Sequence, residues 1–303
     1  MLKTLIKILV MLNIAWIPIG SFSADVVKFR HILSIYSDEN GVGLKQPEGV
    51  ACSEESLLIV ADTGNGRLLR YTFRDKTLQP GSIEIKLPQL MYPIKAEINS
   101  KNEIYVLDGK QRRILCLTAE GEFKRYFQPR GISSSAPIVS KSFTIDRHDN
   151  IYILDILSKR VIALNSQGEY RRHINFPKDY GFFSDLVVDY KGTIILIDST
   201  KAMVYSASKN ATGFSPLTEN LKQFMRFPTS LDTDKRGRIN LVDRNGSKII
   251  ILGQDGSFLG RLSAMGWREG FLNYPSQLCL NNKGEIFIAD TNNNRIQIFA
   301  VVE

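Results

Sequence analysis

The sequence predicts an all-β protein, a six-bladed β-propeller built from four-stranded antiparallel blades. An apolar run that ends in Asp recurs six times, with spacings of 46, 47, 43, 45 and 47 residues between successive aspartates. A period of this length with strand-like patterning is typical of propeller blades. The last unit stops before its fourth strand, and one unassigned strand-like segment, residues 26–33, precedes the first unit.

Each unit is expected to hold four strands. An apolar segment, usually introduced by Pro as at Pro47, is followed by a polar turn such as residues 100–102 and then by the run that ends in Asp. This order predicts a β-hairpin. A third strand starts with a basic residue five positions past the Asp, except in the fourth unit, where Met203 stands. A fourth strand follows, as in residues 122–127.

The repeated aspartates and basic residues are predicted to be structural. A functional site is normally used once, whereas a residue needed in every blade is better explained as a cap for turn amides that also pairs with the cation five residues on. The aspartates are Asp62, Asp108, Asp155, Asp198, Asp243 and Asp290, and the cations are Arg67, Arg113, Arg160, Lys248 and Arg295.

The N-terminal strand is expected to complete the sixth blade. Residues 26–33 alternate in polarity like a strand and are the available candidate for the fourth strand of the last unit. Pairing the two chain ends closes the ring and leaves no open sheet edge.

Residues 1–23 are predicted to be a signal peptide, which leaves residues 24–303 as the propeller. Lys3 and Lys7 precede an apolar stretch at residues 8–19, and Ser21 and Ser23 supply small residues for cleavage. An uncleaved membrane anchor is the alternative, although the stretch is shorter than the roughly 18–20 residues that span a bilayer. We expect a periplasmic or extracellular protein with no transmembrane segment after cleavage.

The net charge narrows the class of partner. Removing residues 1–23 lowers the formal net charge from +8 to +6, which favours a protein or an acidic envelope polymer as partner. Nucleic acid is not expected in that compartment.

The odd number of cysteines, Cys52, Cys116 and Cys279, leaves at least one without a partner in the chain, and all three are expected to act as small buried hydrophobes. The oligomeric state stays open.

The first and last units share a detailed pattern. Residues 47–51 spell Pro-Glu-Gly-Val-Ala, residues 61–67 spell Ala-Asp-Thr-Gly-Asn-Gly-Arg, and residues 289–299 repeat the second motif and extend it to Phe299. These units resemble the NHL-repeat family over residues 25–303, which implies a six-bladed propeller. The family includes scaffolds, receptor sensor domains, nucleic-acid binders and a few lyases, so the resemblance implies no single function.

No catalytic residue, metal or cofactor is predicted. His31, His148 and His173 lie in different units, whereas the amidating lyases of the family use histidine-liganded zinc in the central channel. A lactonase-like calcium site would need oxygen ligands near the axis. Candidates near the ends of inner strands are Glu97, Asn99, Asp146, Asp189, Asp232 and Asn281, for which roles in turns suffice. A metal-dependent hydrolase or lyase acting in the channel remains the alternative function.

Binding residues are expected where the units differ. In propellers the fourth-to-first connections and the second-to-third turns share one face. Cations and an aromatic residue that the repeat does not require gather there: Lys110, Arg112, Lys159, Lys201, Arg244, Trp267 and Arg268. Ile156, Leu157 and Phe182 add apolar surface. Cations beside exposed aromatic residues favour an exported binding or scaffold propeller.

Two other interpretations of this face stay open. In the first, Trp267 and Phe182 pack between blades and the cations form an ordinary solvated rim. In the second, the chain is a structural member of a secreted redox or envelope assembly.

Overall fold

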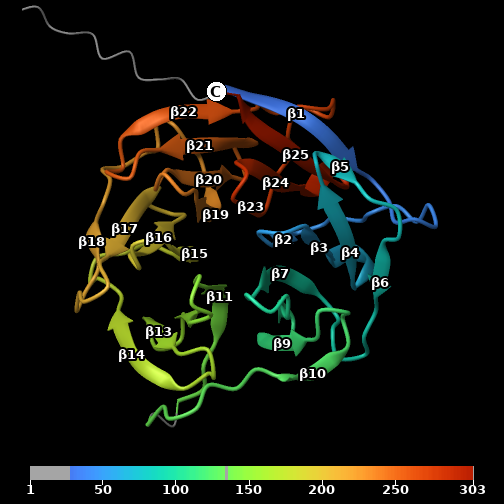
Figure 1. Cartoon of the computed structure of the whole chain (residues 1–303). Helices are drawn as coiled ribbons and strands as arrows, with labels where there is room; N and C mark the ends of the chain where they lie inside the picture. Colours follow the sequence, from blue (N-terminus) through green and yellow to red (C-terminus); the bar gives the residue numbers. More distant parts are fainter. Residues whose placement is uncertain (1–27, 134–135, 303) are drawn as a thin grey trace, which may run out of the picture.

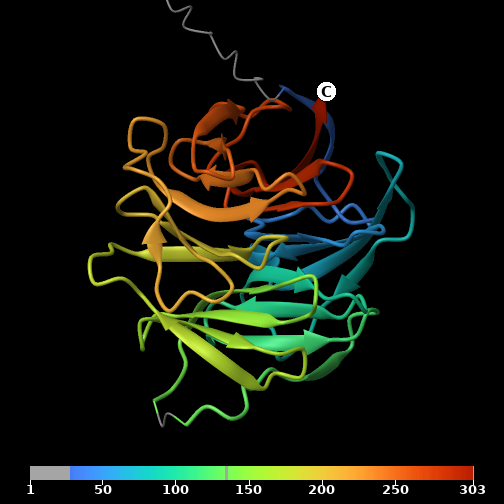
Figure 2. The ribbon, with the colours of Figure 1, turned by 60° about the vertical axis from the view of Figure 1, so that its left-hand side comes forward.

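The computed structural model describes residues 28–133 and 136–302. In this part of the chain the strands form six sheets, which are arranged radially around a central axis (Figures 1 and 2). The all-β, six-bladed fold predicted from the repeat is therefore confirmed. The expected signal peptide, residues 1–23, lies outside the described residues.

Each blade has its innermost strand beside the axis and its later strands further out (Figure 1). Blade 1 consists of β2 (Gly49–Cys52), β3 (Leu57–Asp62), β4 (Arg67–Arg74), β5 (Thr77–Leu78) and β6 (Ile83–Ile85). Blade 2 consists of β7 (Pro93–Ile98), β8 (Ile104–Asp108), β9 (Arg113–Leu117) and β10 (Phe123–Tyr126). Blade 3 consists of β11 (Ser140–Ile145), β12 (Ile151–Asp155), β13 (Arg160–Leu164) and β14 (Tyr170–Asn175).

The second half of the ring repeats this order. Blade 4 consists of β15 (Phe183–Val188), β16 (Ile194–Asp198), β17 (Met203–Ala207) and β18 (Ser215–Pro216). Blade 5 consists of β19 (Pro228–Thr233), β20 (Ile239–Asp243), β21 (Lys248–Leu252) and β22 (Phe258–Leu262). Blade 6 consists of β23 (Leu278–Leu280), β24 (Glu285–Asp290), β25 (Arg295–Val302) and β1 (Lys28–Ile35). Short 3₁₀ turns, η1 (Thr63–Asn65) and η2 (Thr291–Asn293), follow β3 and β24.

The two chain ends complete blade 6 together, as the incomplete last unit predicts. Strand β1 pairs antiparallel with β25, from Lys28 opposite Val302 to Ile35 opposite Ile296. The same pairing is visible in Figure 1, where the first and last strands lie side by side.

The repeated aspartates lie fully buried at the ends of the second strands. Asp62 accepts a hydrogen bond from the Lys45 amide at 2.8 Å, and Asp290 accepts one from the Asn273 amide at 2.6 Å. Each aspartate thus fastens the connection that enters its own blade. Equivalent amide bonds to the other four aspartates come from Met91, Tyr92, Val139, Gly181, Phe182, Arg226 and Phe227.

Four of the five basic residues five positions on pair with the aspartate of their own blade, as predicted. Arg67, Arg160 and Arg295 each donate from Nε, at 2.8, 3.2 and 2.7 Å. Lys248 lies 3.9 Å from Asp243. The predicted pairing of Arg113 with Asp108 is not found among the described residues. Arg113 is exposed, and its guanidinium lies 5.2 Å from the centre of the Tyr126 ring.

The core lies between the blades, because each sheet is covered on both faces by its neighbours. This is why the second strands are continuous apolar runs. Val60 and Leu69 of blade 1, for example, pack in one cluster with Phe287 and Ile298 of blade 6. No helix in the described part of the chain is long and apolar enough to cross a membrane.

One expectation about the cysteines is wrong. Cys52 on β2 and Cys279 on β23 form a disulfide with a Cα–Cα separation of 6.1 Å, whereas both were expected to be buried hydrophobes. The two strands are far apart in sequence but become neighbours when the ring closes. Cys116 is buried with a free thiol, in agreement with the expectation.

Candidate functional site

The register of the inner strands places side chains around the axis in three layers. Each layer takes one residue from each blade, and we call the layers the mouth ring, the middle ring and the chamber ring. The mouth ring is Glu48, Ile94, Lys141, Ser184, Thr229 and Ser276. The middle ring is Gly49, Lys95, Ser142, Asp185, Ser230 and Gln277. The chamber ring is Ala51, Glu97, Thr144, Val187, Asp232 and Cys279. In β7, β11, β15 and β19 the mouth-ring residue lies at a shift in strand register, as β-bulges produce.

The middle ring contains a buried polar cluster. The ammonium of Lys95 on blade 2 lies 2.5 Å from a carboxylate oxygen of Asp185 on blade 4. Asp185 also accepts hydrogen bonds from the hydroxyls of Ser142 at 2.5 Å and Ser230 at 2.8 Å. Burial alone would lower the pKa of Lys95, but Asp185 and Glu97 raise it, so the cluster holds a stable ion pair.

A chamber of about 570 Å³ lies on one side of this cluster, where the first-to-second-strand turns gather. Its wall contains seven acidic side chains and two basic ones. The acidic residues are Glu54, Glu55, Glu97, Asp146, Asp149, Asp189 and Asp232, and the basic residues are Lys95 and Arg147. The chamber is therefore acidic within a chain of net charge +8.

The two carboxylates of the chamber ring are strongly perturbed. Loss of water raises the pKa of Glu97 to about 8; Lys95, 3.6 Å away, opposes this, while Asp232 adds to it. Loss of water also raises the pKa of Asp232 to about 7, although the amides of Leu280 and Thr233 donate to it and favour its charged form. Both groups therefore exchange protons close to neutral pH.

A shallower cavity of about 140 Å³ lies on the other side of the middle ring, on the face of the fourth-to-first connections. Lys141 and Arg244 line it together with Phe182, whose ring centre is 5.5 Å from the Lys141 ammonium. Burial lowers the pKa of Lys141, and Arg112 and Arg244 lower it further while Asp185 and Glu48 oppose them. Cations from blades 2, 3 and 5 thus converge on this mouth.

The binding residues expected from the sequence divide into two groups. Arg112 and Arg244 act on Lys141 at the mouth, and the Lys110 ammonium lies 5.5 Å from the centre of the Tyr92 ring. Lys159, Lys201, Trp267 and Arg268 belong to other connections. Of these, Lys201 forms an ion pair with Asp179 at 2.6 Å, and Lys159 and Arg268 are exposed.

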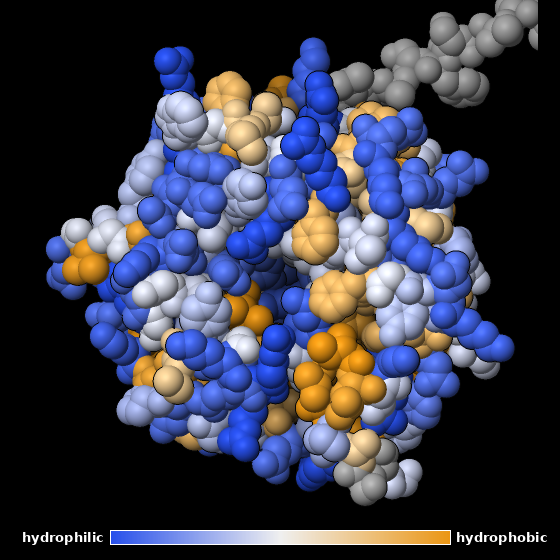
Figure 3. All heavy atoms as spheres, turned by 180° about the vertical axis from the view of Figure 1, so that it is seen from behind, coloured by the Kyte–Doolittle hydropathy of each residue, from blue (hydrophilic) through white to orange (hydrophobic). Residues whose placement is uncertain are grey.

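Trp267 does not pack between blades. Its side chain is 79% exposed, on the connection between β22 and β23, so the interpretation of Trp267 as interblade packing is wrong. Met265 and Phe271 on the same connection are 56% and 43% exposed. Phe182 is 38% exposed. Figure 3 shows one face of the disc, on which hydrophobic patches lie among hydrophilic side chains around a central hollow.

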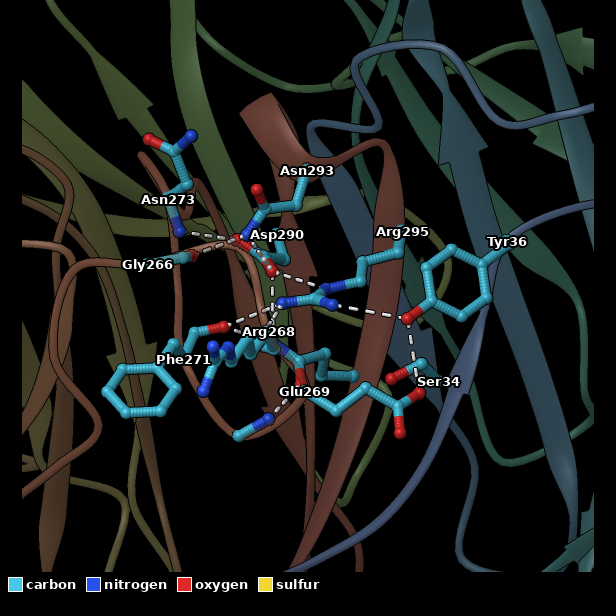
Figure 4. Close-up of polar contacts among 12 residues, drawn as sticks. Ser34, Tyr36, Gly266, Arg268, Glu269, Phe271, Asn273, Asp290, Asn293 and Arg295 are labelled. Atoms are coloured by element: carbon cyan, nitrogen blue, oxygen red, sulfur yellow. Dashed lines mark hydrogen bonds and ion pairs between the residues drawn. The ribbon is translucent and has the colours of Figure 1, made fainter.

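Buried groups of blade 6 hold this connection in place (Figure 4). Arg295 donates to the carbonyl oxygens of Arg268 and Phe271, both at 2.8 Å. Gln297 donates to the Phe271 oxygen at 2.6 Å and accepts from the Gly270 amide at 2.8 Å. The exposed aromatic residues therefore sit on an ordered backbone.

The candidate oxygen ligands near the axis have two different roles. Asn99, Asp146, Asp189 and Asn281 each accept amide hydrogen bonds within their own turns. These four also line the chamber near its rim, whereas Glu97 and Asp232 belong to the chamber ring, deeper on the inner strands. Within residues 28–133 and 136–302, no group of three or more His, Cys, Asp or Glu is placed to hold a metal ion.

Sequence reasoning missed Lys95, Asp185 and Lys141. A signal for them exists, because aligning the inner strands by register puts Lys95 and Asp185, of opposite charge, at one equivalent position. Thr144 was missed as well. It is 4% exposed and faces the chamber, and no hydrogen bond of its hydroxyl is found among the described residues.

Comparisons with known proteins support the fold. Residues 272–299 match the family model of the NHL repeat. No curated protein matches the sequence. Virginiamycin B lyase from Staphylococcus aureus superposes with a TM-score of 0.64 at 11% identity, over 91% of this chain and 100% of that one. A gluconolactonase from Xanthomonas campestris gives 0.66 at 12% identity, over 91% and 90%.

A protein of unknown function from Bacteroides thetaiotaomicron gives a TM-score of 0.66 at 15% identity, over 90% of this chain and 76% of that one. At these identities the likeness concerns the fold and not the activity. The repeat in the sequence, the closure of the ring by β1 and the similar solved structures support the same conclusion. The chain is a six-bladed β-propeller that carries an NHL repeat in its last blade.

Proposed function

We propose that this chain is an exported binding propeller that captures an acidic protein or envelope polymer on the face of its fourth-to-first connections. The observation that carries the proposal is the exposed Trp267 on an ordered connection. Trp and Arg are enriched among residues that dominate binding energy. An ordered backbone supports tight binding because little conformational entropy is lost on association.

Charge supplies the preference for an acidic partner. Burial is the largest cause of the lowered pKa of Lys141 at the mouth of the channel, and repulsion from Arg112 and Arg244 lowers it further. A carboxylate or phosphate group of a partner would relieve that repulsion. The formal net charge of +6 that remains without residues 1–23 draws acidic partners to the whole molecule.

Export is part of the proposal and has two supports. Residues 1–23 have the composition of a signal peptide. The disulfide between Cys52 and Cys279 suits an oxidising compartment.

The test is a titration of residues 24–303 with poly-L-glutamate, together with affinity capture from envelope extract. Trp267→Ala should lose at least about 2 kcal/mol of binding free energy, as residues that dominate an interface do. Ile83→Ala is the control, because Ile83 is an exposed apolar residue on the outer edge of blade 1. Equal binding by both variants and the parent would sink the proposal.

Charge reversal tests the electrostatic half separately. Glu at Lys110, Arg112 and Arg244 together should abolish binding without lowering the melting temperature. Glu at Lys101, Lys235 and Lys283, exposed cations on the opposite face, should leave binding nearly unchanged. Similar losses from the two triple variants would mean that net charge alone governs the interaction.

A further inference from the structure

The chamber on the opposite side of the middle ring has the properties of a second, independent binding site. Its volume of about 570 Å³ falls within the roughly 300–1,000 Å³ of small-molecule sites, which bury most of a ligand and orient it with a few polar groups. Lys95 and Gln277 of the middle ring line both this chamber and the mouth-side cavity, so the middle ring forms the floor of the chamber and lies between the two cavities.

The polar groups of the chamber accept hydrogen bonds more readily than they donate them. Glu97 and Asp232 present carboxylates from blades 2 and 5. Thr144 from blade 3 is 96% buried, and its hydroxyl borders the chamber with no partner among the described residues. Because this oxygen is open to the chamber, water can reach it, and a ligand that supplies a donor can take the place of that water.

Only two basic side chains are found among the described residues of the chamber wall, and both have other contacts. The ammonium of Lys95 is engaged by Asp185 below, and Arg147 lies at the rim with its guanidinium 6.0 Å from the centre of the Tyr190 ring. Glu54 at the rim is exposed and adds negative potential beside Tyr190. Acidic side chains outnumber basic ones from floor to rim.

Apolar residues lie between the polar ones in the chamber ring. Ala51 of blade 1 and Val187 of blade 4 are buried and face each other across the axis, and the disulfide of Cys52 and Cys279 lies next to Ala51. A ligand suited to this lining has a cationic, hydrogen-bond-donating end and a short carbon body.

We propose that the chamber binds a protonated primary amine, whose ammonium lies near Glu97, Asp232 and Thr144 and whose carbon chain lies against Ala51, Val187 and the disulfide. A divalent metal ion is disfavoured, because two carboxylates are few ligands and Lys95 lies 3.6 Å from one of them. The amine could belong to a free metabolite or to a lysine side chain of a partner protein.

Binding should depend on pH in a defined direction. The carboxylates of Glu97 and Asp232, with pKa values of about 8 and about 7, lie near Lys95 and Asp185 of the middle ring. The other charged or titratable groups of the wall lie toward the rim: Glu54, Glu55, Asp146, Asp149, Asp189, Arg147 and Tyr190. An alkylammonium ion keeps its proton up to about pH 9, as a lysine does. Raising the pH from 6 to 9 therefore charges the two acids while the ligand stays cationic, and affinity should rise.

The experiment is a calorimetric titration of residues 24–303 with 5-aminopentanol, with 1,5-pentanediol as the uncharged counterpart. The amine should bind at least tenfold more tightly than the diol at pH 8.5, and its affinity should fall at least tenfold at pH 6. A second arm compares Nα-acetyl-lysine amide with its Nε-acetylated form. Tighter binding of the lysine compound points to a partner's side chain, and tighter binding of the aminoalcohol points to a free amine.

Two isosteric variants locate the site. Glu97→Gln and Asp232→Asn should each weaken amine binding at least tenfold, whereas Glu122→Gln, an exposed acid on another turn, should not. If a chamber variant fails to fold, the comparison of amine affinity at pH 6 and pH 8.5 on the parent protein still tests the proposal. The proposal is overturned if neither amine binds more tightly than its neutral counterpart, or if affinity is the same at pH 6 and pH 8.5.

Discussion

The two ends of the central channel are built from the same six strands yet differ in charge. Lys141, with Arg112 and Arg244 nearby, makes the mouth basic. Glu97 and Asp232, only a few residues further along their strands, make the chamber acidic. The middle ring, in which Asp185 pairs with Lys95, lies between the basic mouth and the acidic chamber. A propeller can thus offer two unlike sites because each strand contributes one residue to every layer.

Both ends depend on closure of the ring. Deleting residues 24–36 removes β1, exposes the edge of β25 and uncovers apolar residues such as Ile298. We expect loss of the cooperative thermal transition, measured by circular dichroism. Substituting Lys28 and Arg30, exposed residues of β1, by Ala is the control and should leave melting close to that of the parent. A deletion variant that melts like the parent would refute closure by β1.

Breaking the Lys95–Asp185 ion pair of the middle ring should have the next largest effect on stability. Asp185→Ala leaves the Lys95 ammonium buried without its main partner and takes an acceptor from Ser142 and Ser230. Breaking a buried ion pair costs about 3–5 kcal/mol, which urea unfolding would measure. Asp255→Ala, at an exposed turn, should change stability by less than about 0.5 kcal/mol.

A double variant sharpens this test. Lys95→Met combined with Asp185→Leu removes both charges and should recover most of the lost stability. If the double variant is as unstable as Asp185→Ala, the loss reflects altered packing and not an unpaired charge.

Titration of Glu97 in the chamber should also make the free energy of unfolding depend on pH. The folded-state pKa of Glu97, about 8, lies above its unfolded value near 4.5, so the folded state holds more protons between these values. Its contribution to the free energy of unfolding therefore falls as pH rises through that window, by at most about 1.4 kcal/mol per pH unit. Glu97→Gln should flatten the decline between pH 5 and 8, and an unchanged slope in urea unfolding would contradict the shift.

The sequence was sufficient for the strand order and the closure. The repeated Asp marks the end of every second strand, and counting from Asp290 leaves the last blade one strand short. The polar layers were harder to predict because Lys95 and Asp185 are 90 residues apart in sequence, on blades 2 and 4, and only the ring geometry brings them into contact. The exposure of Trp267 could not be inferred either, since it depends on how Arg295 and Gln297 shape the connection.

The disulfide has a consequence for the integrity of the chain outside the cell, if the protein is exported as proposed. Cys52 and Cys279 are separated by 227 positions, so three quarters of the backbone lies inside one covalent loop. A protease that cuts any single peptide bond within that loop produces two fragments that remain linked through sulfur. The interblade contacts then hold the fragments in register, so one nick need not end the working life of the molecule.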